Sequence, residues 1–280
     1  MATALKYVSK LQGKRVLVLG GTSGMGFCVA EAALEHGAHV VVSGSNEARL
    51  SAALSRLRQS PVASFKGESA AGTTDNDAAD SDPLVSGTTC DLSDNATMEA
   101  NIDKLLRFAT ADGQRKLDHV VLTAGDPIKI VPVSEATPEE IMRVMTVRYT
   151  GAIILAKLLP KYQYQSHTSS LTITSGANAS KPSPNWSLVA GVSAAVQGLG
   201  RGLAVDLKPV RVNVVSPGAV HTELFDSIPN KEGFLAVMAK ATLTGHVGRP
   251  EDAAEAYLYC MKDNFITGTV LDTNGGKFLA

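Results

Sequence analysis

The sequence predicts an α/β fold in which helices cover both faces of a parallel, seven-stranded sheet within a single domain. Short apolar runs alternate with longer stretches of helical periodicity, as expected of strands and crossover helices. A glycine-rich turn follows the first apolar run directly. The 280 residues, 44% of them hydrophobic, are enough for one large core. We therefore expect one doubly wound domain over residues 1–280.

Seven short apolar runs are the predicted strands, and they cover residues 15–19, 39–43, 86–90, 119–122, 170–174, 211–215 and 269–272. One helix has a clear beginning at Thr137, whose hydroxyl suits an N-cap. Pro138 then fits the first turn, and Glu140 occupies the capping-box position. Lys208-Pro209 is expected to end a later helix, which includes residues 189–201.

One segment, residues 60–85, does not follow this alternation of short apolar runs and helical stretches. It is rich in Ser, Ala, Gly and Asp, and its low apolar content cannot offset the entropy of ordering the chain. We therefore predict a mobile surface insertion there. Its four neighbouring aspartates leave two interpretations open, a solvated acidic loop or a metal site, and they are Asp75, Asp77, Asp80 and Asp82.

Composition argues against several kinds of partner. The formal net charge is −1 without clusters of Lys or Arg, which gives no electrostatic reason to expect nucleic acid or an anionic membrane. The N-terminus lacks a signal pattern and no apolar run approaches membrane-spanning length, so we expect a cytoplasmic protein that spans no membrane. Cys28, Cys90 and Cys260 lack metal-ligand spacing and indicate a reducing compartment, with small buried side chains as their simplest role. No metal site is predicted.

The glycine-rich turn after the first strand predicts a dinucleotide site. Residues 20–26 read Gly-Gly-Thr-Ser-Gly-Met-Gly. Gly20 permits the turn, Gly24 lets the backbone approach a pyrophosphate, and Gly26 allows close packing, while the helix N-terminus favours negative charge. Together the predicted cofactor contacts of this turn are Gly20, Thr22, Ser23, Gly24, Met25 and Gly26.

Further motifs follow in an order that resembles the short-chain dehydrogenase/reductase family, whose fold is Rossmann-like. Asp91-Leu92 resembles the pair that contacts adenine, and Thr123-Ala124-Gly125 resembles an Asn-Ala-Gly turn. Pro217 and Gly218, followed by Val220 and Thr222, resemble the segment that closes over the nicotinamide. The resemblance covers nearly the whole chain and implies that these residues bind a nicotinamide cofactor.

The end of the second predicted strand favours NADP(H) over NAD. An acidic residue there would repel a 2′-phosphate, but this sequence has Ser43, Ser45 and Asn46, with Arg49 a few residues on. These groups can bind the 2′-phosphate through hydrogen bonds and charge. The alternative is that Arg49 is an ordinary solvated helix residue.

The resemblance also implies four catalytic positions, of which only Ser175 matches the family. The family's Tyr and Lys correspond to Val189 and Ser193, and its Asn corresponds to Arg148. Val189 has no titratable group for general acid catalysis, so reduction of an ordinary ketone is not expected. An iminium ion is already cationic and accepts hydride without a proton. Arg148 is expected to bind cofactor or substrate, and the alternative is a salt bridge at a helix surface.

The loop before this helix resembles that of the fungal reductase/Diels-Alderases of the malbrancheamide and paraherquamide pathways. It carries Pro182, Ser183, Pro184 and Trp186, with Ser183 where those proteins have Asp. The resemblance implies that Trp186 stacks on the substrate, that the prolines shape the pocket wall, and that Ser183 and Ser175 act at the site. The alternative is a proline-rich turn with the Trp packed in the core.

The resemblance implies NADPH-dependent reduction of a prenylated indole dipeptide-derived iminium, followed by an intramolecular Diels-Alder reaction that forms a bicyclo[2.2.2]diazaoctane. Residues 221–245 are expected to form an apolar lid in which Leu224 and Phe225 contact substrate, with ordinary surface packing as the alternative. Two other functions stay open: reduction of another imine or activated alkene, or a catalytically silent NADP(H)-binding protein. A homo-oligomer, dimer or tetramer, is expected by resemblance.

Overall fold

The computed structural model describes residues 6–60, 83–226 and 228–280, and it confirms a single doubly wound α/β domain. The sheet has the order β3-β2-β1-β4-β5-β6-β7, and every neighbouring pair is parallel. The strands are β1 (Arg15–Leu19), β2 (His39–Gly44), β3 (Val85–Thr89), β4 (His119–Leu122), β5 (Ser170–Thr174), β6 (Arg211–Pro217) and β7 (Val270–Thr273). The seven predicted strands are all present, shifted by no more than two residues at an end.

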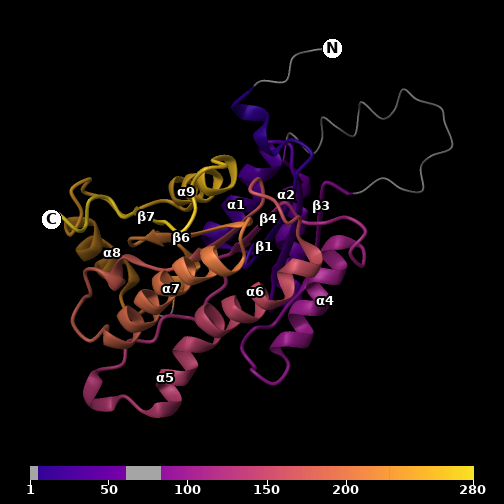
Figure 1. Ribbon diagram of the computed structural model, residues 1–280. Helices are drawn as coiled ribbons and strands as arrows, with labels where there is room; N and C mark the ends of the chain where they lie inside the picture. Colours follow the sequence, from indigo (N-terminus) through magenta and orange to yellow (C-terminus); the bar gives the residue numbers. More distant parts are fainter. Residues whose placement is uncertain (1–5, 61–82, 227) are drawn as a thin grey trace, which may run out of the picture.

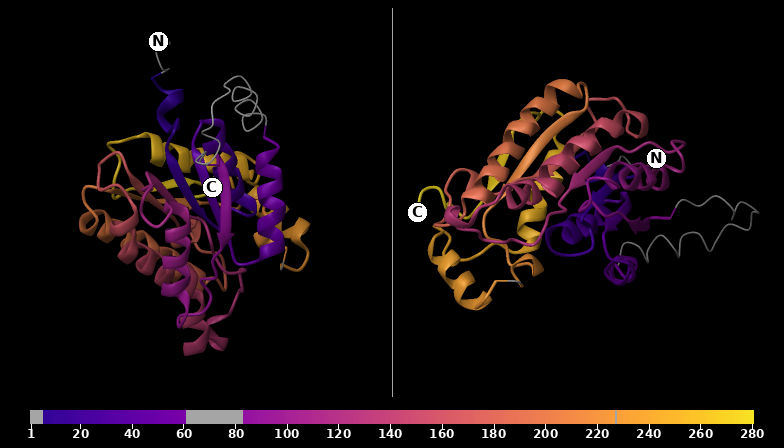
Figure 2. Two further views of the ribbon diagram at one scale, coloured as in Figure 1. Left: turned by 90° about the vertical axis from the view of Figure 1, so that its right-hand side faces the viewer. Right: turned by 90° about the horizontal axis from the view of Figure 1, so that it is seen from below.

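Helices lie on both faces of the sheet (Figure 1). One layer contains α4 (Met98–Thr110), α6 (Gly151–Tyr162) and α7 (Ser187–Asp206). The other contains α1 (Gly24–Glu35), α2 (Glu47–Arg58) and α9 (Pro250–Lys262). Two shorter helices, α5 (Pro138–Met145) and α8 (Lys231–Lys240), lie outside these layers. Figure 2 shows the sheet from below, between α6 and α7 on one side and α1 and α9 on the other.

Two apolar clusters, one on each face, form the core. The first joins α4, α6 and α7 to the sheet, and the second joins α1, α2 and α9 to it. Strands β1, β4 and β5 are buried along nearly their whole length, as in a parallel sheet covered on both sides. Burial on both faces explains why β1 and β4 read as nearly continuous apolar runs, whereas β5 also buries Ser170, Thr172 and Thr174. Cys90 and Cys260 belong to this core, whereas Cys28 is only half-buried.

Of the segment predicted as an insertion, residues 60–85, the structure describes Ser60 and residues 83–85. Ser60 is buried at the end of α2, and Val85 is the first residue of β3. Ser60 and Val85 are therefore part of the folded domain. Strand β3 begins at Val85, one residue earlier than predicted, because Val85 pairs with Val40 of the parallel strand β2. Residues 61–82, with the four aspartates, lie outside the described residues.

The helix beginning at Thr137 is confirmed, but its capping box is not. The Thr137 hydroxyl accepts a hydrogen bond from the Glu140 amide at 3.2 Å. The Glu140 carboxylate does not return to the cap, because Lys129 and Arg143 donate hydrogen bonds to its two oxygens. The Glu140 carboxylate therefore forms ion pairs with Lys129 and Arg143 instead of capping the helix.

The expectation that no segment approaches membrane-spanning length is wrong for α7. By length and composition, Ser187–Asp206 is long and apolar enough to cross a membrane. In the structure the helix packs on the sheet through Val192, Val196, Gly200 and Leu203, all buried. Its buried apolar residues are therefore explained by packing against the sheet, in the layer that also contains α4 and α6.

Acid should destabilise the protein through His119, the first residue of β4. Burial, with smaller contributions from the charges of Arg211 and Lys14, lowers the pKa of His119 to about 3. Its usual pKa in an unfolded chain is about 6.5. Since the unfolded state then binds the proton more readily, stability should fall as the pH drops from about 6.5 toward 3.

Replacing His119 with Asn keeps a polar partner for Ser170, whose Oγ lies 2.9 Å from the His119 Nδ1, but removes the titration. We expect His119→Asn to lose less stability on acidification, as measured by denaturant unfolding at pH 7 and pH 4. The exposed residue His167 provides the matched control His167→Asn. Equal pH dependence in His119→Asn and the parent protein would contradict the assignment.

Candidate functional site

The predicted cofactor residues follow the carboxyl ends of five strands, which all point to the same edge of the sheet. Strands β1 and β4 are neighbours although β2 and β3 separate them in the sequence, so the chain reverses its direction of winding between them. Ligands of doubly wound folds bind in the crevice at this reversal point. The loops after β1, β2, β3, β4 and β6 therefore converge on one site.

The turn between β1 and α1 leaves room for a phosphate. Gly20 has a φ of 88°, a left-handed conformation that glycine adopts without strain. A Cβ atom at Gly26 would overlap the Gly20 carbonyl oxygen and the Thr123 hydroxyl. Ser23 caps α1 without a side-chain hydrogen bond, so it leaves the amide groups of the first turn, at Gly24 and Met25, available to a ligand. This arrangement fits the pyrophosphate of a dinucleotide.

The end of β2 presents three of the four residues expected to bind a 2′-phosphate. Ser45, Asn46 and Arg49 are exposed. The Asn46 Oδ1 accepts a hydrogen bond from the Arg49 amide at 2.9 Å and caps α2, which places Arg49 in the exposed first turn of that helix. Ser43 differs, because only 1% of it is exposed and its carbonyl oxygen accepts hydrogen bonds from the Gly20 and Gly21 amides. Ser43 therefore positions the glycine turn.

The loops after β3 and β4 complete the edge of the crevice. Asp91 is exposed and its carboxylate accepts a hydrogen bond from the Ser93 amide, whereas Leu92 is buried. The Thr123 amide and hydroxyl both donate to the Leu19 carbonyl oxygen, at 2.9 and 3.0 Å. The Ala124 amide donates to the same oxygen. These bonds attach the turn after β4 to the end of β1.

Arg148 lies in a π-helical turn, η4 (Thr146–Thr150), between α5 and α6. Its guanidinium packs on Gly125, where an added Cβ would lie 2.5 Å from the Arg148 Cζ. It makes no ion pair with any described residue, so the expected alternative of a surface salt bridge is not observed. Burial lowers the pKa of Arg148, an effect that Tyr257 and Asp126 oppose. A guanidinium keeps its charge nevertheless, and π-helical turns are frequent at functional sites.

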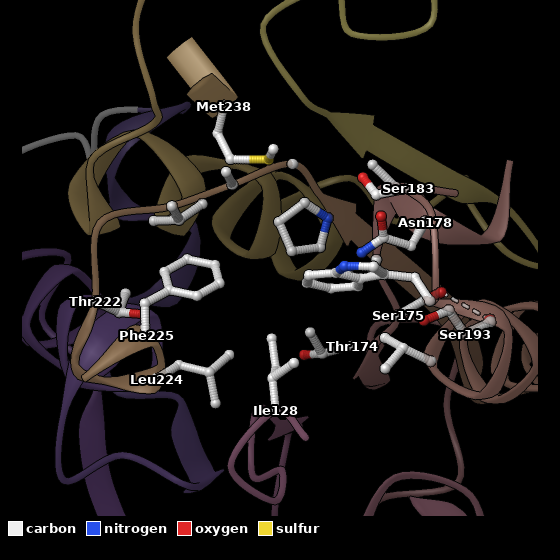
Figure 3. A pocket seen from close by; sticks show the side chains of 18 of the residues that line it. Ile128, Thr174, Ser175, Asn178, Ser183, Ser193, Thr222, Leu224, Phe225 and Met238 are labelled. Carbon is white, nitrogen blue, oxygen red and sulfur yellow. Dashed lines mark hydrogen bonds between the residues drawn. The ribbon is translucent and has the colours of Figure 1, made fainter. Parts of the chain in front are cut away.

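A pocket opens beside Arg148, with about 810 Å³ of empty space including its mouth. Leu224 and Phe225 lie across it from Ser175, Ser193 and Asn178 (Figure 3). Three polar side chains therefore lie together opposite these two apolar ones, and Thr222 lies beside Phe225. The predicted residues on its wall are Met25, Arg148, Ser175, Ser183, Trp186, Pro217, Gly218, Val220, Thr222, Leu224 and Phe225.

Among its described residues the pocket wall has no phenol for proton transfer, and its one ammonium group is that of Lys277. Val189 and Ser193, which correspond by resemblance to Tyr and Lys, both line the pocket. Ser175 donates its hydroxyl hydrogen to the Ser193 carbonyl oxygen at 2.8 Å, so it can only accept a hydrogen bond from a ligand. The described residues on the wall include no carboxylate, histidine, cysteine or tyrosine.

Tyr257 lies behind this wall on α9. Its hydroxyl is 2.8 Å from the Thr174 Oγ1, and Thr174 lines the pocket. Because Thr174 donates its own hydrogen to the Leu122 carbonyl oxygen, Tyr257 must be the donor in their shared bond. Burial raises the pKa of Tyr257 above its ordinary value. Thr174 therefore cannot pass a proton from Tyr257 to the pocket.

The loop before α7 turns two residues, Ser183 and Trp186, toward the pocket. Ser183 lies on the wall, whereas Pro182 and Pro184 are exposed and do not line it, contrary to expectation. Asn185 has a φ of 67°, a conformation that asparagine tolerates better than most residues. This turn brings Trp186 inward, where only 6% of it is exposed.

Trp186 meets the segment expected to form a lid. Its ring is nearly parallel to that of Phe234 on α8, with centroids 6.4 Å apart, and Phe234 contacts Phe225 at 5.3 Å. Thr222 approaches the glycine turn, since a Cβ at Gly24 would lie 3.1 Å from its methyl carbon. Trp186 is therefore packed, as in one interpretation, and it also lines the pocket, as stacking on a substrate requires.

Several contributors to the described wall were not predicted from the sequence, among them Ile128, Asn178 and Lys277. Ile128 follows the Thr123-Ala124-Gly125 turn, and Asn178 follows Ser175 by three residues, so position relative to known motifs was a usable signal. Lys277 comes just after Gly275-Gly276, and both glycines have positive φ. Two such glycines after the last strand indicate that the chain turns back across the sheet edge.

Comparison with known proteins agrees with the fold and the glycine turn. A family model described as an SDR-like Rossmann domain matches residues 7–280. The chain belongs to the short-chain dehydrogenase/reductase family, an oxidoreductase family whose members bind nicotinamide cofactors.

Two curated relatives cover the chain from end to end. The short-chain dehydrogenase/reductase malC of Malbranchea aurantiaca is 46% identical over 283 residues, which span 100% of both proteins. The short-chain dehydrogenase/reductase ucsE of an Acremonium species is 42% identical over 99% of this chain and 100% of that protein. The solved structure of the MalC reductase/Diels-Alderase from Malbranchea aurantiaca is similar with a TM-score of 0.85, covering 98% of this chain and 99% of the other.

Gly26→Ala should disrupt the cofactor crevice. The added methyl group would overlap backbone at Gly20, which cannot move without displacing β1, so we expect a lower melting temperature and loss of nicotinamide-cofactor binding. Gly191→Ala is the matched control on α7, because nothing lies within 4 Å of its added Cβ and alanine is favoured in helices. Thermal unfolding and NADPH titration measure both effects. Normal NADPH affinity in Gly26→Ala would contradict the assigned role.

Proposed function

We propose that this protein is an NADPH-dependent iminium reductase that also templates an intramolecular Diels-Alder reaction, forming a bicyclo[2.2.2]diazaoctane ring from a prenylated indole dipeptide-derived substrate. The observation that carries the proposal is a pocket beside the nucleotide crevice. Its described wall has aromatic and apolar groups, and the proton donors on it are two cationic side chains, amides and hydroxyls. The similarity to MalC, a reductase/Diels-Alderase, supports it.

The missing phenol is consistent with an iminium as hydride acceptor. Hydride transfer to a ketone places negative charge on oxygen, which an acid must neutralise. Hydride transfer to the carbon of a C=N⁺ group yields a neutral amine, and no proton is needed. Bound NADPH supplies the hydride. In this proposal Arg148 orients the cofactor or substrate through its guanidinium, and Ser175 accepts a hydrogen bond.

The cycloaddition requires a shaped surface more than acid–base chemistry. Holding diene and dienophile in one conformation can contribute several kcal/mol, on the order of 7, to lowering the barrier. Trp186, Phe225 and Phe234 form a continuous aromatic wall, and Leu224 extends it. We propose that residues 221–245 act as the lid that closes this wall over the substrate, while Ser183 contributes a hydrogen bond.

We further propose that the cofactor is NADP(H), bound through Ser45, Asn46 and Arg49. If so, Arg49→Ala should raise the KM for NADPH about tenfold, the effect of losing one charged hydrogen bond, with little change for NADH. Arg58→Ala provides the control, since Arg58 is an exposed arginine at the other end of α2. Steady-state kinetics with both cofactors measure the ratio. Equal effects on NADPH and NADH would contradict the proposal.

The proposed reaction is tested by incubating the protein with NADPH and a prenylated indole dipeptide aldehyde, which condenses to the iminium. We expect NADPH oxidation and a single dominant diastereomer of the bridged product. Trp186→Ala should lower kcat/KM on the order of tenfold and broaden the diastereomer ratio, since stacking is lost, while Trp186→Phe should retain most of both.

The outcomes separate the proposal from its alternatives. NADPH oxidation without a bridged ring would indicate a reductase of another imine or an activated alkene. Absence of both NADPH oxidation and any change in diastereomer ratio would indicate a silent NADP(H)-binding protein. We also propose that the protein is cytoplasmic and forms a homo-oligomer, either a dimer or a tetramer. Sedimentation measures the oligomeric state.

A further inference from the structure

Lys277 places an ammonium group on the wall of the pocket, where the reaction described above does not use it. The residue follows β7 and is half-buried. Its Nζ donates a hydrogen bond to the Asn178 Oδ1 at 3.3 Å, and Asn178 lines the same pocket from the 3-10 turn η5 (Ala177–Ala179). Two residues 99 positions apart in the sequence therefore share one polar corner.

The backbone of Lys277 is held from two sides. The Asn274 Oδ1 accepts hydrogen bonds from the amides of Gly276 and Lys277, at 3.0 and 3.1 Å. Lys181 donates to the Lys277 carbonyl oxygen at 2.9 Å. Since Lys181 begins the loop that carries Ser183 and Trp186, these bonds attach the backbone of Lys277 to the loop that carries the aromatic wall.

The charge of Lys277 has no anionic partner among the described residues. Its one side-chain hydrogen bond goes to a neutral amide, so two of its three ammonium hydrogens stay available. Burial lowers the pKa of Lys277, and the nearby Lys181 lowers it further. An incompletely solvated cation gains stability from any oxygen acceptor brought to it.

Asn178 adds a second donor to the same corner. Its Oδ1 accepts the hydrogen bond from Lys277, which leaves its Nδ2 group to donate. An ammonium and a carboxamide thus converge on one place. Arg148 is the other charged residue on the described wall, so both charges there are positive and both disfavour the cationic end of a ligand.

We propose that Lys277 and Asn178 form a subsite for a lactam carbonyl oxygen of the substrate, and that this contact orients the substrate in the pocket. The inference rests on the proposed function, because the dipeptide-derived ring supplies the amide carbonyl. The ammonium attracts the electron-rich oxygen and repels the iminium carbon, so the substrate enters with its carbonyl at this corner. Lys277 and Asn178 thereby determine which face of the iminium is presented.

Binding of a simple lactam tests the subsite without turnover. The probe is cyclo(Leu-Pro), a diketopiperazine that does not fluoresce, titrated in the presence of NADP⁺. Trp186 is the one tryptophan of the chain and lines the pocket, so its fluorescence reports binding. We expect Lys277→Met to weaken binding about tenfold or more, the effect of a lost charged hydrogen bond, and Lys277→Arg to retain most of the affinity.

Asn178→Asp provides a second, nearly isosteric variant. Its carboxylate would pair with the Lys277 ammonium and compete with the probe, so we expect a similar loss of affinity. The control is Lys104→Met, which removes the same charge from an exposed position on α4 and should leave binding unchanged. NADP⁺ affinity and thermal unfolding, measured alongside, show whether each variant is folded.

Unchanged lactam affinity in a folded Lys277→Met or Asn178→Asp protein would overturn the subsite, as would an equal loss in Lys104→Met. The proposed function can fail separately. If cyclo(Leu-Pro) binds as expected but no bridged product forms from the aldehyde, the subsite stands and the proposed reaction falls. If the product forms with unaltered rate and diastereomer ratio in Lys277→Met, the reaction stands and the subsite falls.

Discussion

The close approach of α1 to the ends of β1 and β4 is the constraint on which the rest of the structure depends. Gly26 has no side chain, so the helix can lie against the Gly20 carbonyl oxygen and the Thr123 hydroxyl. The Leu19 carbonyl oxygen, which accepts three hydrogen bonds from Thr123 and Ala124, joins the same two strands. This junction places the first turn of α1 at the crevice. It also positions Gly125 and Gly24, against which Arg148 and Thr222 pack.

The fold was predictable because its determinants are local. Most strands are short runs rich in valine and leucine, as burial on both faces of a parallel sheet favours, whereas β3 and β5 also carry Ser and Thr. The glycine turn is equally local, since Gly20, Gly24 and Gly26 lie within seven residues. The start of β3 at Val85 was missed because the preceding polar sequence concealed a strand that is defined by its partner β2.

The site was only partly predictable, because its wall is assembled from distant segments. Ser183 and Trp186 were found from one motif, but whether Pro182 and Pro184 face inward depends on the twist of the loop, which composition does not reveal. Ser43 was expected to contact ligand, yet the sheet buries it. Lys277 reaches the pocket only because two glycines turn the chain back, a tertiary event without a side-chain motif of its own.

The left-handed backbone at Asn185 limits how this loop can be altered by evolution or by protein engineering. Most side chains with a Cβ are strained at a φ of 67°, so randomised libraries that include this position would lose most members to a distorted turn. Pro182 and Pro184, being exposed, leave room for substitutions that change the loop's stiffness. Diversity intended to enlarge the range of accepted molecules is therefore best placed at Ser183, which points inward from a backbone that its neighbours hold in shape.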